Sequence, residues 1–229
     1  MKIVTWNCNL NFTTKFERLE SIDADVYIIQ ECENLKENYF SGSKFFWTGR
    51  IENKGLGVLI KNGSASLDAI HNPNLINFLP IRSDGLRILG VWAYNHRAKK
   101  FGDNVSGETI KAIEFYKDWL VEESLPCVFG GDFNNSVVWD KQNNENNFQN
   151  INKRLEVLGF RSAYHSKNNA AYGAEEHATF FHTKKESKKY HIDYLYLKSA
   201  DFKSIEIGKY EDWIKLSDHV PVTVELSIL

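Results

Sequence analysis

The strongest constraint on the fold is a series of strand-like segments spread over the whole sequence. Eight segments are rich in β-branched and aromatic residues and are separated by Gly, Asn, Asp and Ser, a pattern typical of β-strands joined by turns. Several are continuous apolar runs, which indicates strands that are covered on both faces. The eight predicted strands are residues 2–7, 24–31, 55–61, 86–94, 126–134, 190–197, 202–207 and 220–226.

Helices are fewer than strands. A capping-box pattern at residues 14–17 predicts the first helix, the second is expected to begin after Ser106, and Gly159 is placed to end the third. The segment 161–189 is expected to be a loop. The second helix is carried by Ile110, Ile113, Lys117 and Leu120, and the third by Phe148, Ile151, Leu155 and Leu158.

This balance of elements predicts the fold class α/β (α+β). Two mostly antiparallel sheets packed face to face, with helices outside, would cover strands that are apolar on both sides. Because no Pro- or Ser-rich linker divides the chain, we expect a single domain spanning residues 1–229.

Charge and cysteine content narrow the functional classes. The 28 Lys and Arg and 30 Asp and Glu give a formal net charge of −2, which argues against high-affinity, non-specific binding to duplex nucleic acid. Cys8, Cys32 and Cys127 form no CxxC pair, so we expect buried free thiols in a reducing compartment. No apolar run approaches the ~20 residues of a membrane span, and the start of the sequence lacks a secretion-signal pattern. We therefore expect a cytoplasmic protein that does not associate with membranes.

The functional signal lies where the predicted strands end. In a strand, alternate residues share a face, so Asp132 and Asn134 are expected to point the same way after the apolar run that precedes them. A polar group at the end of a buried strand is costly unless it is hydrogen-bonded or wet, and six such ends predict that they meet at one cleft. These residues are Asn7 and Asn9, Glu31, Tyr94 and His96, Asp132 and Asn134, His191 and Asp193, and Asp218 and His219.

Six short motifs carry a family resemblance. The segments TWNCN, IIQE, VWAYNH, GGDFN, HIDYL and LSDH, in this order, resemble the endonuclease/exonuclease/phosphatase superfamily from residue 3 to about residue 226. That superfamily includes exonuclease III-like and DNase I-like nucleases, inositol polyphosphate 5-phosphatases and neutral sphingomyelinases. The resemblance implies a four-layer α/β/β/α sandwich, and it implies metal-dependent hydrolysis of a phosphate ester by in-line attack of an activated water.

The resemblance also implies a metal site. Glu31 would bind the ion, with Asn7 and Asp218 close to it, and Mg²⁺ fits because it prefers hard oxygen ligands; Mn²⁺ is the alternative. Some relatives carry Asp where this chain has Asn9. A neutral amide there weakens the anionic cage, so we expect one loosely held ion rather than two tightly held ions.

Catalytic roles follow from the same resemblance. His219 would act as a general base or polarise the phosphate, with its tautomer fixed by Asp193. Asp132 would align the water or assist the leaving group, and Asn134 would bind a phosphate oxygen. Whether Asp132 or His219 takes the proton stays open. The full predicted catalytic set is Asn7, Tyr94, Asp132, Asn134, Asp193 and His219.

The phosphate contact in the segment 94–96 is open between two residues. Tyr94 matches the phosphate-binding tyrosine of the exonuclease III-like branch, whereas other branches place a histidine in this segment, where His96 lies.

The substrate is not fixed by the motifs. Basic segments at 96–100 and 184–189 flank the predicted cleft, and the aromatic residues near them suit a phosphate backbone with stacked bases. We expect a monomeric nuclease acting on DNA or RNA. The alternatives are a phosphatase or phosphodiesterase acting on a small molecule or lipid headgroup, and a non-catalytic binding module. The predicted substrate-binding residues are His96, Arg97, Lys99, Lys100 and His191.

Overall fold

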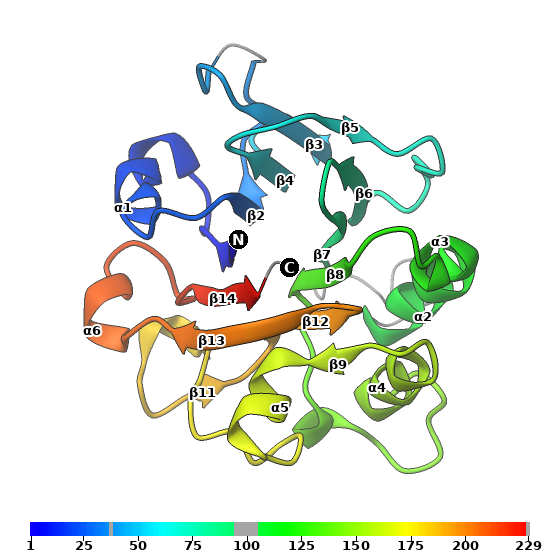
Figure 1. Ribbon diagram of the computed structural model, residues 1–229. Helices are drawn as coiled ribbons and strands as arrows, with labels where there is room; N and C mark the ends of the chain where they lie inside the picture. The colour runs from blue at the N-terminus through cyan, green and yellow to red at the C-terminus, as the bar shows by residue number, and fades with distance from the viewer. Residues whose placement is uncertain (37–38, 94–104, 228–229) are drawn as a thin grey trace.

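Two six-stranded sheets packed face to face form the centre of the molecule (Figure 1). The structure is a computed structural model that describes residues 1–36, 39–93 and 105–227. The first sheet contains, in spatial order, β13 (Asp201–Ile207), β14 (Val222–Ser227), β1 (Lys2–Asn7), β2 (Val26–Cys32), β4 (Lys54–Ile60) and β3 (Lys44–Ile51). The second contains β5 (Ala65–Leu67), β6 (Phe78–Ser83), β7 (Arg87–Trp92), β8 (Cys127–Asp132), β12 (Asp193–Lys198) and β9 (Arg161–Ser162).

Both sheets are mostly antiparallel, as predicted. In the first sheet only β1 and β2 run parallel, and in the second only β7 and β8 do. Neighbouring parallel strands end at the same edge, so each parallel pair brings two strand ends together.

Helices cover the outer face of each sheet (Figure 1). The helices α1 (Phe16–Glu20) and α6 (Tyr210–Trp213) pack on the first sheet, and α2 (Val105–Phe115), α3 (Lys117–Val121) and α4 (Phe148–Val157) pack on the second. The order of layers is therefore α/β/β/α, which confirms the predicted sandwich. Within the described ranges, no helix has the length and apolar composition needed to cross a membrane.

Alternation along β1 shows how the strands divide between layers. Ile3 lies in the core between the two sheets, whereas Val4 and Trp6 lie in the core under α1 and α6. Asn7, two residues after Thr5, continues on the side that faces the second sheet. The polar end of this strand is thus directed into the interface between the sheets.

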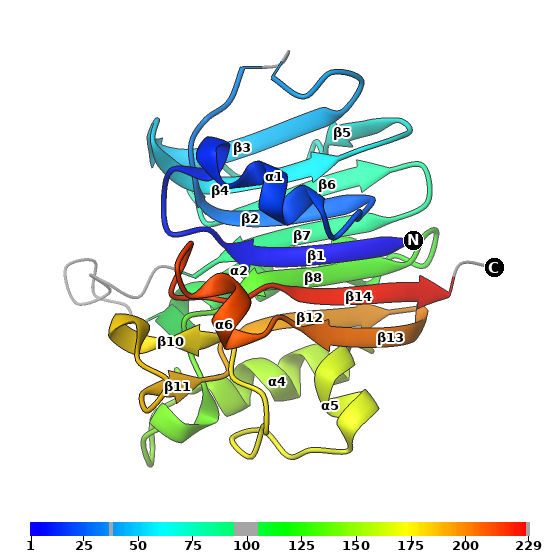
Figure 2. The same ribbon diagram turned by 90° about the vertical axis from the view of Figure 1, so that its left-hand side faces the viewer.

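The functional strand ends meet at one end of the sandwich. Because β12 is antiparallel to β8, its first residue, Asp193, pairs with Asp132, the last residue of β8. Likewise β14 is antiparallel to β1, and Val222 pairs with Thr5. Figure 2 shows β1 running from the N-terminus on the right to this end on the left. We call it the site end and the other the opposite end.

Several elements differ from the sequence predictions. The strands β3, β5 and β6 were not predicted; Pro80 inside β6 looks like a strand breaker, yet it pairs with Leu89. The segment 161–189 is not a simple loop, since it contains α5 (Ala163–Asn168), η4 (His182–Lys184) and the strands β10 (Phe180–Phe181) and β11 (Lys189–Tyr190). Two further 3-10 turns are η1 (Phe12–Thr14) and η3 (Val137–Trp139).

The capping box predicted at residues 14–17 does not form. Lys15 occupies the position before α1, and no side chain caps the helix. The hydroxyl of Thr14 donates instead to the carbonyl of Asn11, because Thr14 belongs to η1.

Candidate active site

A hydrogen bond between one asparagine and one aspartate side chain joins the two sheets at the site end. Asn7 ends β1 in the first sheet and Asp132 ends β8 in the second, and Asn7 Nδ2 donates to Asp132 Oδ2 at 2.9 Å. The same nitrogen lies 3.4 Å from Glu31 Oε1. Both Asn7 and Asp132 are buried, so this contact closes the end of the inter-sheet core with polar groups.

Glu31 reaches the site through a β-bulge. The register between β2 and β4 shifts between Gln30 and Cys32, and Glu31 has a left-handed φ of 60°. Bulges re-aim a side chain at the edge of a sheet. The re-aimed carboxylate is partly exposed and forms a 2.9 Å ion pair with Lys54 Nζ. Glu31 therefore lies at the rim of the site, above the buried Asn7 and Asp132.

Asp193 fixes the orientation of His219. The Nδ1 of His219 lies 2.9 Å from Asp193 Oδ2, and both side chains are buried. The backbone of His219 is held as well, because its N–H donates to Ser217 Oγ, whose hydroxyl donates to the carbonyl of Asn7. With Nδ1 engaged by a carboxylate, the other ring nitrogen, Nε2, is the one presented to a substrate.

The buried charges at the site perturb each other. Burial raises the pKa of Asp132, and the neighbouring Asp193 carboxylate raises it further, to about 8. For His219, burial alone lowers the pKa, but the Asp193 carboxylate and its hydrogen bond outweigh burial and raise the pKa to about 10. Strongly perturbed carboxyl and imidazole groups that share one location are typical of a functional site.

Two glycines explain how Asp132 comes so close to Asp193. A Cβ atom on Gly130 would lie 2.4 Å from Leu195 Cδ2, and one on Gly131 would lie 1.9 Å from the carbonyl oxygen of Val91. Gly131 also has a φ of 145°, a conformation that L side chains rarely adopt. The glycines let the backbones of β7, β8 and β12 approach closely enough to place both carboxylates together.

Asn134 reaches the site by a turn and not by strand alternation. The strand β8 ends at Asp132, and Asn134 has a left-handed φ of 49°. Its backbone N–H donates to Asp132 Oδ1 at 2.8 Å, and its Nδ2 donates to Asp132 Oδ2 at 3.0 Å. The predicted neighbourhood of Asp132 and Asn134 is therefore observed, although the predicted extended backbone is not.

Asp218 lies at the rim, where Asn9 holds it. The Nδ2 of Asn9 donates to Asp218 Oδ1 at 3.0 Å, and the backbone N–H of Asn9 donates to Asn7 Oδ1, also at 3.0 Å. The oxygen of the Asn7 amide is thus turned towards Asn9, and its NH₂ group towards Asp132 and Glu31.

The donor set fits a divalent cation. Asp132, Asp193 and His219 each offer a ligand atom, and these atoms lie within 4.8 Å of one another. Within the described residues, Asp193 Oδ1 is buried with no hydrogen-bond partner, which leaves an acceptor for a positive charge. Carboxylates dominate the group, and hard oxygen ligands suit Mg²⁺ or Mn²⁺. The predicted ligands Glu31 and Asp218 lie at the rim beside this buried group.

The full-length similarities are to solved nuclease and phosphatase structures. The 3′-5′ exonuclease NExo from Neisseria meningitidis matches with a TM-score of 0.76 at 16% identity, and the 3′ phosphatase NExo from Neisseria bound to a product DNA hairpin matches at 0.74 and 18%. An AP endonuclease from Archaeoglobus fulgidus matches at 0.70 and 15%; each comparison covers 100% of both chains. The chain has the fold of the endonuclease/exonuclease/phosphatase superfamily. No protein-family model and no curated protein sequence matches it.

His191 is not part of the group around His219. It is buried behind β12, where its Nδ1 lies 2.8 Å from the carbonyl oxygen of His177 and its ring packs on Tyr164 and Tyr194. Burial lowers the pKa of His191 to about 4, so the ring is neutral. The position of His191 does not support the predicted substrate contact. The reason is that β12 begins at Asp193, so strand alternation does not extend back to His191.

One histidine of the segment 161–189 differs from the expectation of an exposed loop. His165 is not an exposed loop residue, since its ring is largely buried and lies 3.0 Å from Glu175 Oε1. His182 is exposed, as expected. Five other predicted residues, Tyr94, His96, Arg97, Lys99 and Lys100, lie outside the described residues, so their roles stay predictions.

A row of aromatic side chains leads to His219, and two of them, Phe180 and Tyr190, are among the aromatic residues that the sequence places near the lysines of 184–189. The ring centroid of Phe180 lies 4.7 Å from that of His219, Tyr190 lies 6.4 Å from Phe180, and Trp139 lies 4.8 Å from Tyr190. We call Trp139, Tyr190 and Phe180 the aromatic row. Trp139 was missed because it belongs to a segment that is distant in sequence from these lysines.

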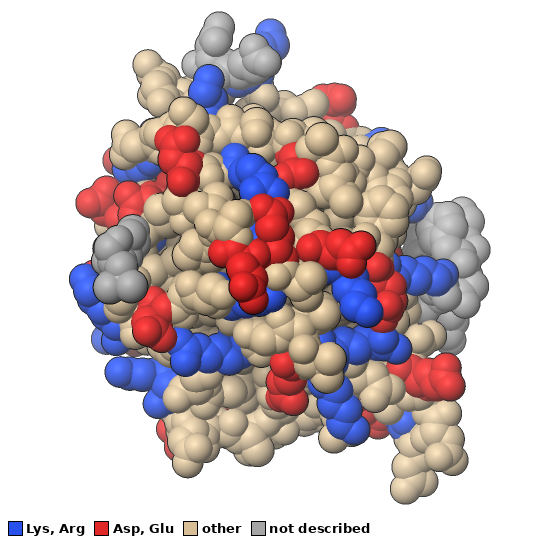
Figure 3. Space-filling model, turned by 45° about the vertical axis from the view of Figure 1, so that its right-hand side comes forward, with Lys and Arg blue, Asp and Glu red and all other residues tan. Residues whose placement is uncertain are grey.

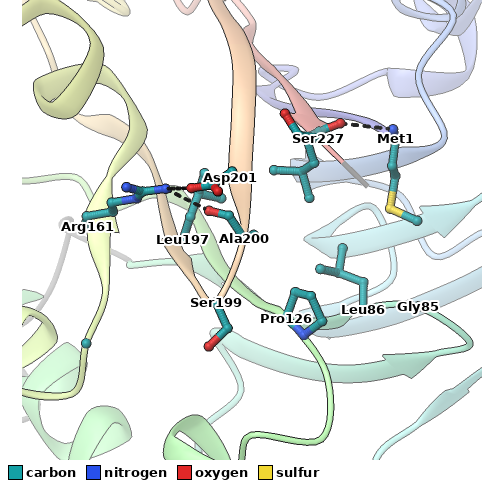
Figure 4. Close-up of a pocket in the computed structure, with 12 residues that line it drawn as sticks. Met1, Gly85, Leu86, Pro126, Arg161, Leu197, Ser199, Ala200, Asp201 and Ser227 are labelled. Atoms are coloured by element: carbon teal, nitrogen blue, oxygen red, sulfur yellow. Dashed lines mark hydrogen bonds and ion pairs between the residues drawn. The ribbon is translucent and has the colours of Figure 1, made fainter. Parts of the chain in front are cut away.

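A separate hollow lies at the opposite end of the strands (Figure 4). It has a volume of about 720 Å³ and is lined by Met1, Pro126, Arg161, Asp201 and Ser227, among others. Its lining comes from the start of β1 and the ends of β12 and β14. The hollow is therefore remote from the carboxylate and histidine group and is not part of the candidate active site.

Proposed function

We propose that the protein is a metal-dependent phosphoesterase that hydrolyses phosphodiester bonds of nucleic acid. The observation that carries this proposal is the connected group at the site end. The Asp193–His219 pair lies beside Asp132, and Asn7 links Asp132 to Glu31 across the two sheets. Such a group contains what phosphoester hydrolysis needs, namely acid and base groups and anionic ligands for a cation, within reach of one phosphate.

His219 and Asp132 would carry out the proton transfers of the hydrolysis. Asp193 holds Nδ1 of His219 and raises the pKa of the ring, so Nε2 carries a proton at neutral pH and can donate it to a phosphate oxygen; only the neutral ring can accept a proton from water. Asp132 receives hydrogen bonds from Asn7 and Asn134, which fix its carboxylate beside the imidazole. An oriented water would attack the phosphorus in line with the leaving oxygen, with one of these two groups accepting its proton.

The cation would be Mg²⁺, with Mn²⁺ as the alternative. Asp132 and Asp193, whose ligand atoms lie within 4.8 Å of each other, would hold it, with the rim carboxylates Glu31 and Asp218 as the further ligands expected from the sequence. When bound, such an ion neutralises phosphate charge and makes a bound water more acidic.

The aromatic row favours nucleic acid over a small phosphate ester. Trp139 is 37% exposed and begins a row of rings that ends at His219, and aromatic faces stack on bases of any sequence. The hairpin of β10 and β11 carries exposed lysines at its tip, and Figure 2 shows it at the site end. These are Lys184, Lys185, Lys188 and Lys189. The similar structures named above as an exonuclease, an AP endonuclease and a phosphatase bound to DNA point the same way.

On the face seen in Figure 3, the described residues form no continuous basic track. Over the face seen in Figure 3, acidic and basic side chains lie next to one another, in line with a net charge of −2. A polyanion would therefore be held mainly at the site end, with modest affinity that falls as salt increases.

A hydrolysis panel tests the proposal. Plasmid, abasic duplex, single-stranded RNA, a 3′-phosphorylated oligonucleotide, bis-p-nitrophenyl phosphate and inositol phosphates are each incubated with the protein, with Mg²⁺ or with EDTA. We expect cleavage of at least one nucleic-acid substrate by the wild type with Mg²⁺. His219→Gln should abolish it. His71→Gln, which changes a histidine outside the site, should leave it intact.

A second variant separates the substrate classes. Trp139→Ala removes the outer ring of the aromatic row, and loss of one stacked base is worth about 1–3 kcal/mol, so we expect KM for an oligonucleotide to rise about 5-fold or more. The rate with bis-p-nitrophenyl phosphate should not change. Hydrolysis of small esters alone, with nucleic acid untouched, would replace the nuclease proposal by the phosphatase alternative, and no hydrolysis of any substrate would favour a binding module.

A further inference from the structure

The chain makes an unusual turn directly after β1. Asn9, Leu10 and Asn11 all have left-handed backbones, with φ of 52°, 66° and 50°. This conformation costs about 1–2 kcal/mol per residue for an L-amino acid, although Asn tolerates it better than Leu. Three such residues in succession therefore require an interaction that holds them in place.

Lys15 supplies that interaction. Its ammonium group donates to the carbonyl oxygens of Cys8 at 2.7 Å, Asn9 at 3.1 Å and Leu10 at 2.8 Å. An ammonium has three N–H donors, and three carbonyls of one turn receive them. The left-handed backbone makes these carbonyls converge on one point, so the turn and the cation stabilise each other.

The turn controls the direction of the Asn7 amide. The backbone N–H of Asn9 donates to Asn7 Oδ1, and this bond turns the Asn7 NH₂ group towards Asp132 and Glu31. The side chain of Asn9 in turn holds Asp218. A change in the turn would therefore disturb Asn7, Asp132 and Asp218 together.

A second lysine shows that this arrangement is specific. Lys2 lies at the other end of β1 and donates its ammonium to one carbonyl, that of Ile22, at 2.9 Å. The carbonyl of Ile22 precedes one left-handed residue, Asp23 with a φ of 53°, and lies at the other end of β1 from the candidate site. Lys2 is thus a matched control for a lysine that bridges β1 to the segment after it.

We propose that Lys15 is a positioning residue of the active site. Its ammonium group holds the turn 8–11 by three hydrogen bonds and thereby orients the side chains of Asn7 and Asn9. The catalytic consequence rests on the function proposed above. The structural consequence does not, because it concerns the hydrogen bonds of Asn7 and Asn9 in the protein alone.

The first experiment needs no activity. Hydrogen exchange and ¹⁵N–¹H spectra are recorded for the wild type, Lys15→Ala and Lys2→Ala. In Lys15→Ala we expect the Asn9 amide to exchange about 10-fold faster or more, as local opening becomes easier, while amides in the centre of β1 keep their protection. The side-chain NH₂ resonances of Asn7 should shift. Lys2→Ala should change neither signal, and unchanged Asn9 exchange in Lys15→Ala would overturn the proposal.

The second experiment measures catalysis with chemical rescue. Misplaced catalytic groups can cost about 10²-fold in rate, so we expect kcat of Lys15→Ala to fall by about 10- to 100-fold with KM changed by less than about 3-fold. n-Propylammonium, which has three N–H donors, should restore much of the loss, whereas tetramethylammonium, which has the same charge and no N–H donor, should not. Equal effects of the two cations would show that charge alone matters and would overturn the positioning role. A wild type that hydrolyses nothing would refute the proposed function and leave the exchange experiment to decide on Lys15.

Discussion

The two ends of the strands place an aspartate in opposite environments. At the site end, Asp193 binds His219, and the side chains are 1% and 5% exposed. At the opposite end, Asp201 binds Arg161, and the side chains are 85% and 49% exposed. An exposed ion pair contributes little to stability, whereas a buried one is costly to form and is retained only in a well-fitted environment. If the proposed function is correct, the chemistry takes place at the end that holds the buried pair, and the exposed pair contributes only a surface interaction.

Left-handed backbone is concentrated at the site end but is not confined to it, since Asp23 and Ser199 towards the opposite end also have positive φ. Asn9, Glu31 and Asn134 at the site end all have left-handed backbones without being glycine. Strain of this kind persists where the surrounding structure over-determines the conformation, and it is concentrated at functional sites. The site end thus holds both the buried charges and much of the unfavourable backbone geometry.

Replacing one aspartate at each end gives the largest expected contrast. Asp193→Asn removes the charge that orients His219, and we expect kcat on the substrate found in the panel to fall on the order of 10²–10⁴-fold, the range of a lost acid–base group. Asp201→Asn should leave kcat within about 2-fold, since its partner is an exposed surface group. Steady-state kinetics of both variants, with circular dichroism to confirm folding, checks this. Equal losses would remove the functional distinction between the ends.

A second contrast uses one glycine from each end. Gly131→Ala places a Cβ against the backbone carbonyl of Val91, so we expect a loss of about 3 kcal/mol or more in the free energy of unfolding. Gly159 has a φ of 85°, but its Cβ would meet only the flexible side chain of Lys198, at 3.6 Å. Gly159→Ala should cost only about 1 kcal/mol. Urea denaturation measures both, and a larger loss at Gly159 would contradict the close packing inferred at the site end.

The buried His191 makes stability depend on pH. Burial lowers its pKa to about 4 in the folded state, against an ordinary value of 6.5. Between these values the unfolded state binds more protons, so the stabilising effect of neutral His191 is present above pH 6.5 and is lost as pH falls towards 4. At pH 5 the loss should be about 2 kcal/mol.

His191→Asn tests this pH dependence, because Asn can still donate to the carbonyl of His177 but does not titrate. We expect its stability to fall less steeply than that of the wild type between pH 6.5 and pH 5. His182→Asn, at an exposed position, should keep the wild-type slope. Parallel curves for wild type and His191→Asn in urea titrations would show that His191 is not held neutral.

The smallest effect is expected in a charged pair far from the site. Arg82 binds Glu122 at 2.8 Å, and both side chains are 35% exposed. Glu122→Gln should lower the free energy of unfolding by less than about 1 kcal/mol, and the difference should shrink in high salt. Urea denaturation at low and high salt measures it. A loss comparable to that of Gly131→Ala would show that the surface network matters more than its exposure implies.

Much of the fold followed from the sequence because strand patterns are local. The prediction for β1, residues 2–7, matches the observed strand, and the meeting of Asn7, Glu31 and Asp132 followed from polar residues at strand ends. Edge strands such as β5 were missed, since three partly exposed residues carry no clear apolar pattern.

The finer geometry of the site did not follow, because it depends on backbone dihedrals that the sequence pattern does not encode. Alternation failed for Asn134 and His191, which lie beyond the strand ends, and nothing in the spacing indicated that Lys15 binds three carbonyls. The choice between Tyr94 and His96, the cytoplasmic location and the monomeric state stay predictions.

One consequence concerns when during synthesis the protein could become active. The hydroxyl of Ser217 bonds the carbonyl of Asn7, 210 positions earlier, and β14 pairs with β1. A chain is synthesised from its N-terminal side onward, so Asn7 is made long before Ser217 and His219, which complete the site. If the proposed function is correct, a growing polypeptide has no assembled centre with which to cut RNA until the segment around Ser217 and His219 has emerged from the ribosome.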